Sequence, residues 1–160
     1  MAQYIMNQDR CDYPSPRTFV CEEANGLYRG LILCIEGHVE NNIWLNAGDE
    51  DFEAYKVRLA ADGDKKENLL MHTTVPFAYD ERLGEKDFIL KEGQVGRGHV
   101  IKTGDEYTLP LDFVQGVADV GDKVGLDADG KLVKDATVIL GEVMKIYNWC
   151  GQESVLVRFY

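Results

Sequence analysis

Residues 123–133 have the sequence KVGLDADGKLV, and this stretch decides the class of fold. Asp129 and Gly130 are residue types that accept the positive φ of a tight turn, and a short apolar run lies on either side of them. The stretch therefore predicts a β-hairpin. A similar sequence, KVRLAADG, occurs earlier in the chain at residues 56–63. A duplication of one β unit would explain the likeness, but we favour the same turn chemistry arising twice.

Strand-like patterns extend over the rest of the chain. Residues 55–59 (YKVRL) alternate apolar and charged side chains, which predicts a half-buried strand, and residues 154–160 (SVLVRFY) predict a closing strand. Turn signals recur at gaps of about 10 to 20 residues, and no segment shows sustained helical periodicity. We therefore expect a mainly β protein, a single antiparallel β-barrel or β-sandwich domain with little helix.

The first twenty residues differ from the remainder. Residues 13–17 (YPSPR) contain two prolines, which favour an extended backbone and oppose a helix. We expect an extended N-terminal arm over residues 1–20 and a β domain over residues 21–160. The β domain has possible sub-units at about 21–84 and 85–160.

Composition narrows the classes of function. The chain has 160 residues, of which 45% are hydrophobic and 28% charged, and this suits one domain with its own core. Seventeen basic against 28 acidic residues give a net charge of -11. That charge argues against non-specific binding to nucleic acid and against a polybasic membrane contact. The N-terminus also lacks the pattern of a secretory signal, so we expect synthesis in a cytoplasm with neither nucleic acid nor membrane as partner.

Reactive side chains are few and scattered. The four cysteines contain no Cys-x-x-Cys pair, which predicts free thiols and no zinc site, and the three histidines lie far apart in the sequence. A pairing of Cys34 with His38 is conceivable, but Gly37 weakens it. In residues 93–98 (GQVGRG) the glycines predict bends or close backbone approaches. We expect no catalytic residues, no metal and no cofactor.

Part of the chain resembles a viral family. The run from residues 71–82 (MHTTVPFAYDER) through residues 93–98 to residues 101–108 (IKTGDEYT) resembles virion structural proteins of tailed bacteriophages. Residues 120–143 are similar to the β module of phage head decoration proteins. The resemblance implies a capsid decoration or cement protein that stabilises the head shell. It further implies the major capsid protein as partner, a homo-oligomer (a trimer), and a place on the virion surface after assembly in the host cytoplasm.

The arm provides candidate contacts under this interpretation. An extended arm that adds a strand to a sheet edge gains affinity from backbone hydrogen bonds. Deletion of residues 1–20 is then expected to leave a folded protein that no longer binds capsids. Arg97 is a further candidate because it can bind a partner's carboxylate. The candidate capsid or subunit contacts are Tyr4, Ile5, Tyr13, Pro14, Pro16, Phe19 and Arg97.

A binding module for carbohydrate or a host receptor is the alternative function. Trp44 and Trp149 could stack on sugar rings, because an aromatic side chain combines a large contact area with a polar edge. Both tryptophans could instead belong to the core or to a subunit interface, and we favour that interpretation for them.

Overall fold

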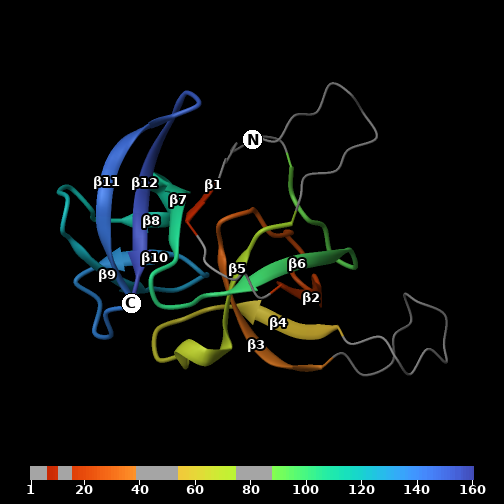
Figure 1. The fold of residues 1–160 in the computed structure, drawn as a ribbon. Coiled ribbons are helices and arrows are strands. Elements are labelled where there is room, and N and C mark those ends of the chain that lie inside the picture. Colours follow the sequence, from red (N-terminus) through yellow and green to blue (C-terminus); the bar gives the residue numbers. More distant parts are fainter. Residues whose placement is uncertain (1–6, 11–15, 39–53, 75–87) are drawn as a thin grey trace, which may run out of the picture.

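The computed structural model describes residues 7–10, 16–38, 54–74 and 88–160. These residues form a closed five-stranded barrel and a seven-stranded sheet, which lie side by side (Figure 1). The helical turns in the described part are short: η1 (Lys66–Asn68) and η3 (Leu111–Phe113). The prediction of a mainly β fold with little helix is therefore confirmed. No described helix is long and apolar enough to span a membrane.

The barrel is built from strands between Pro16 and Val100 and closes in the order β2-β4-β3-β5-β6. Its ladders are antiparallel except for the parallel pair β2–β4. The strand predicted at residues 55–59 is confirmed as β4. The barrel strands are β2 (Pro16–Val20), β3 (Ile32–His38), β4 (Tyr55–Leu59), β5 (Leu69–His72) and β6 (Val95–Val100).

The sheet has the order β1-β7-β12-β11-β9-β10-β8. The predicted hairpin is confirmed as β9–β10, and its turn residues Asp129 and Gly130 have φ of 60° and 72°. The sheet strands are β1 (Asn7–Arg10), β7 (Glu106–Pro110), β8 (Val114–Gln115), β9 (Lys123–Leu126), β10 (Leu132–Lys134), β11 (Gly141–Trp149) and β12 (Gln152–Phe159).

Two apolar clusters share strands β3 and β5. Because side chains alternate along a strand, Leu33 and Leu70 point into the barrel, whereas Ile32 and Met71 point out of it toward the sheet. The outward residues pack with sheet residues such as Tyr107. Strand β5 is consequently buried along its whole length, and the outer face of the barrel shares one apolar core with the sheet.

Two of the domain boundaries expected from the sequence differ from those in the structure. Strand β2 is part of the closed barrel, so the β domain begins by Pro16 rather than after residue 20. The barrel ends at Val100 and β7 begins at Glu106, so the change from one β unit to the other falls between these residues rather than at 84. Both differences arise because β2 and β6 pair with each other over a long sequence separation.

Candidate binding surface

The hairpin β11–β12 projects beyond the strands on either side of it (Figure 1). On one side β9 pairs only with Gly141 and Glu142, and on the other side β7 pairs with β12 no further than Ser154. A two-residue turn joins the strands, with φ of 52° at Cys150 and 82° at Gly151. Positive φ at both positions is the geometry of a type I′ turn, which matches the twist of the two strands. The tip is therefore a well-defined hairpin that protrudes from the sheet.

One face of this tip presents aromatic side chains. The Tyr147 and Trp149 rings lie edge to face, with centroids 6.0 Å apart, and the Lys145 Nζ lies 4.5 Å from the Tyr147 ring centroid. The Tyr147 hydroxyl is 2.6 Å from the Thr108 Oγ1, which is itself buried on β7. This hydrogen bond fixes the tyrosine above the sheet. The resulting face, residues 145, 147 and 149, is called the aromatic face below.

The other face of the tip carries Ile146, whose side chain is 38% exposed. Ile146 lies opposite Val155, a buried residue of the shared core. The register shifts between Val143 and Lys145, which places a β-bulge where the hairpin leaves the body of the sheet. A bulge increases the local twist, so the tip is turned relative to the strands below it.

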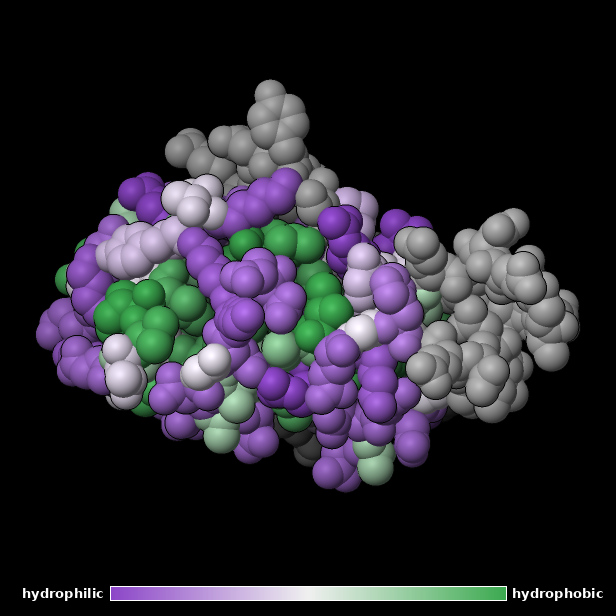
Figure 2. All heavy atoms as spheres, turned by 90° about the horizontal axis from the view of Figure 1, so that it is seen from below, coloured by the Kyte–Doolittle hydropathy of each residue, from purple (hydrophilic) through white to green (hydrophobic). Residues whose placement is uncertain are grey.

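The two tips of the sheet both expose apolar residues. Val138, on the loop that precedes β11 at the end opposite the hairpin tip, is 52% exposed. Val120, on the loop that precedes β9 and lies beside Val143, is 66% exposed. Figure 2 views the molecule from this lower side and shows apolar patches framed by hydrophilic side chains. These valines belong to separate loops without a shared aromatic or charged group, so the hairpin tip is the better-defined binding surface.

The residues proposed as contacts from the sequence lie in different environments in the structure. Trp149 lies on the aromatic face rather than in either core cluster. Pro16 and Arg97 are exposed on the outside of the barrel, on strands that pair with each other. Phe19 is wholly buried inside the barrel, so it cannot serve as a capsid anchor in this fold. The remaining candidates lie outside the described residues: Tyr4, Ile5, Tyr13, Pro14 and Trp44.

His72 is a structural residue inside the barrel. Its Nδ1 is 2.8 Å from the Tyr28 carbonyl oxygen, and its Nε2 is 2.8 Å from the Thr74 Oγ1. The Arg97 N–H donates to the same Thr74 oxygen. A neutral imidazole that donates from Nδ1 and accepts at Nε2 satisfies this chain of hydrogen bonds. Burial lowers the pKa of His72 to about 4, which keeps the ring neutral at pH 7.

This burial predicts a loss of stability in acid. The unfolded chain takes up a proton at His72 near pH 6.5, whereas the folded protein does so only near pH 4. Stability is therefore full above pH 6.5 and falls by about 3 kcal/mol as the pH drops to 4. We expect a His72→Gln variant, which keeps a donor and an acceptor but does not titrate, to lack this part of the decline. Urea unfolding of both proteins from pH 7 to pH 4 measures the free energy of unfolding at each pH. The same decrease with falling pH in both proteins would contradict the prediction.

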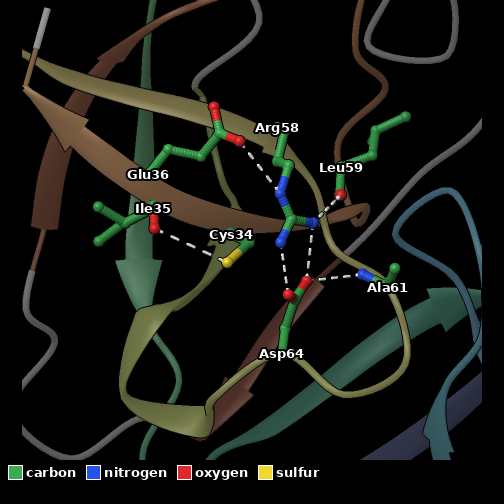
Figure 3. A network of polar contacts seen from close by, with 7 residues as sticks. All are labelled: Cys34, Ile35, Glu36, Arg58, Leu59, Ala61 and Asp64. Carbon is green, nitrogen blue, oxygen red and sulfur yellow. Dashed lines mark hydrogen bonds and ion pairs between the residues drawn. The ribbon is translucent and has the colours of Figure 1, made fainter.

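The Arg58 network ties β4 to the turn that follows it (Figure 3). The guanidinium donates to Asp64 at 2.9 Å and lies 3.2 Å from Glu36, while the Ala61 N–H donates to the same carboxylate at 2.8 Å. The hydrogen bond from Arg58 is the main cause that lowers the pKa of Asp64. Burial, and then the Asp64 charge, raise the pKa of the adjacent Cys34 thiol. Cys34 is thus held as a thiol rather than activated as a nucleophile.

The conceivable pairing of Cys34 with His38 does not form. Cys34 lies opposite Arg58 and His38 lies opposite Tyr55, with a register shift between Ile35 and Gly37. Arg58 and Tyr55 are three residues apart on β4, so their partners point to opposite faces of the ladder. The irregularity that the sequence predicts at Gly37 is the physical reason why Cys34 and His38 point to opposite faces.

Metal-ligating side chains do not gather in the part of the chain that the structure describes, which contains no group of three or more His, Cys, Asp or Glu residues suited to an ion. The described cysteines Cys21, Cys34 and Cys150 are free. Neither a protein-family model nor a curated protein matches the chain.

Proposed function

We propose that the protein is a structural component of a tailed-phage virion, which decorates and stabilises the head shell without catalysing a reaction. The observation that carries the proposal is the hairpin tip, where Tyr147, Trp149 and Lys145 form an aromatic face on a rigid β support. Aromatic side chains are enriched at protein interfaces, where they combine apolar area with a polar edge. A protruding sheet face suits docking to a large protein surface.

Two further features support this role. The module whose sequence is similar to decoration proteins, residues 120–143, includes the confirmed hairpin β9–β10 and the base of β11. Strand β1 adds antiparallel to β7 at the edge of the sheet, so the N-terminal segment already pairs in the manner of an added strand. The partner under this proposal is the major capsid protein, the site is the capsid surface, and assembly in the host cytoplasm as a homo-oligomer, a trimer, follows from the resemblance.

Quantitative mass spectrometry of virions purified from the phage that encodes the chain tests this proposal. Copies in the hundreds, released together with shell fragments, are the expected result. A handful of copies would assign the protein to the portal, neck or tail, and complete absence would overturn a structural role.

A binding assay with shells that lack the protein then tests whether the hairpin tip makes the contact. The Trp149→Ser variant should bind these shells more weakly than the unmodified protein. The Val138→Ser variant, changed at the opposite end of the sheet, should bind them as well as the unmodified protein does.

Carbohydrate binding is a second candidate because Trp149 lies at the exposed hairpin tip rather than in a core cluster. An aromatic ring beside polar side chains can stack on the apolar face of a sugar. A glycan array tests this: reproducible binding that Trp149→Ala abolishes without unfolding would favour a virion-associated binding module over a cement protein.

A further inference from the structure

Strand β11 is an edge strand over its outer half. It pairs with β12 along its whole length, but on its other side β9 stops at Gly141 and Glu142. Val143 is covered by the loop before β9, because its N–H donates to the Asp122 carbonyl and its own carbonyl accepts from the Gly121 N–H. Along residues 145–149 no ladder partner other than β12 is present among the described residues.

The turn determines which backbone groups point outward from this edge. In a hairpin with a two-residue turn, the flanking residues, here Trp149 and Gln152, hydrogen-bond to each other. Alternation along the strand then directs the N–H and C=O of Tyr147 and Lys145 toward β12. The N–H and C=O of Ile146 and Asn148 point away from the hairpin. Within the described part of the chain, two donors and two acceptors are thus available to another strand.

Edges of this kind usually carry a feature that prevents pairing, such as proline, several charges or an inward-pointing charge. The segment at residues 145–149, KIYNW, has one charge and no proline. Its single bulge lies at the base rather than within the segment. The side chain of Ile146 is 38% exposed. The edge is therefore long enough, apolar enough and regular enough to accept a strand.

We propose that this edge pairs with the same edge of a second copy of the chain, antiparallel about a two-fold axis at Tyr147. In this register Ile146 lies opposite the partner's Asn148, and these two residues exchange both hydrogen bonds. The symmetry repeats the pair, so all four outward groups of each copy are bonded. An axis centred on Ile146 would place Asn148 opposite the partner's bulge. An axis centred on Asn148 would place Ile146 opposite the partner's turn. In neither alternative do all four outward N–H and C=O groups form hydrogen bonds.

The side chains fit the same register. Lys145 lies opposite the partner's Trp149, where a cation and an indole attract each other, and Tyr147 lies opposite the partner's Tyr147. The lysines of the two copies are four residues apart along the ladder and do not face each other. The chain as a whole carries a charge of -11, which opposes self-association, but this segment carries one positive and no negative charge. The strand is therefore complementary to itself.

This dimer is independent of the role proposed in the virion. A two-fold contact joins chains in pairs, whereas the resemblance to decoration proteins implies a trimer. Failure of the virion measurements would leave the edge pairing unaffected, and failure of the edge pairing would leave the virion role unaffected.

Cysteine cross-linking tests the register. Tyr147 and its symmetry mate form a non-hydrogen-bonded pair, with Cα atoms about 4.5 Å apart, which suits a disulfide. In a background with Cys150→Ser, which removes an exposed thiol, and Cys11→Ser, which removes the cysteine outside the described residues, we expect Tyr147→Cys to give a covalent dimer in a glutathione buffer. Lys145→Cys is the matched control, because the two introduced thiols would be about 13 Å apart along the strands. Equal cross-linking of both variants, or none for Tyr147→Cys, would overturn the proposal.

Sedimentation velocity tests the pairing without cross-links. We expect the unmodified chain to form dimers and Ile146→Pro to weaken dimerisation at least tenfold, because proline lacks the outward N–H. The hairpin itself should survive, since this N–H does not bond to β12. Ile146→Val keeps the N–H and should still dimerise. A monomeric unmodified chain at every concentration, or an unchanged assembly in a folded Ile146→Pro variant, contradicts the proposal.

Discussion

Deletion of residues 2–20 should prevent the barrel from folding. The deletion removes β2, which pairs with β6 from Pro16 to Val20 and with β4 at Phe19 and Val20. Without β2 the barrel has two open edges and an exposed interior, because Phe19 and Val20 are both buried. Truncation of one buried phenylalanine alone costs about 3–5 kcal/mol, against a typical total stability of about 5–15 kcal/mol. Loss of the cooperative transition in urea, followed by circular dichroism, is the expected result.

Deletion of residues 2–15 is the matched control, since it keeps β2 intact. We expect this shorter deletion to retain a cooperative transition. If the two deletions unfold at the same urea concentration, β2 is not an integral barrel strand. This result also decides how capsid binding is tested. The sequence led us to expect a folded protein after deletion of residues 1–20, but that deletion would remove a barrel strand. Only the shorter deletion therefore tests the role of the N-terminal segment in a folded protein.

The features predicted correctly from sequence are those encoded locally. The β9–β10 hairpin follows from Asp129 and Gly130, and β4 follows from alternation within five residues. The close approach expected of the glycines is also confirmed, since a Cβ at Gly96 would lie 2.8 Å from the Phe19 ring and 2.5 Å from the Leu90 side chain. Each of these signals lies within a short stretch of sequence, so residue type and spacing are sufficient to predict it.

The features missed from sequence depend on contacts between distant segments. The prolines near residue 15 suggested an arm, yet Pro16 occupies the first position of β2, where a missing N–H is tolerated. The burial of Phe19 depends on β6, which lies far along the chain. The β11–β12 turn was missed because Cys150 adopts positive φ, which is uncommon for cysteine. Trp149 was recognised as a candidate, whereas Tyr147 and Lys145 join it only once the hairpin is formed.

Replacement of Gly125 by alanine should destabilise the protein by more than about 3 kcal/mol. A Cβ at this position of β9 would lie 1.9 Å from the Val138 carbonyl oxygen and 2.7 Å from the Ala136 Cβ. The loop that carries both residues is held to β9 at each end, because the Asp135 N–H donates to Lys123 and the Leu140 N–H donates to Val124. Relief of the overlap requires at least one of these bonds to break.

Gly98→Ala is the matched control for this substitution. Gly98 also lies in a strand without positive φ, but a Cβ there would lie 3.1 Å from the Met71 carbonyl oxygen, a contact that small shifts relieve. We expect a loss near 1 kcal/mol in urea unfolding, and similar losses for both variants would mean that the loop does not pack tightly on β9. The loop leads directly into Gly141, where β11 begins, so its displacement also loosens the base of the hairpin. Gly125→Ala should therefore weaken the capsid binding proposed for the hairpin tip as well as lowering stability, whereas Gly98→Ala should leave that proposed binding unchanged.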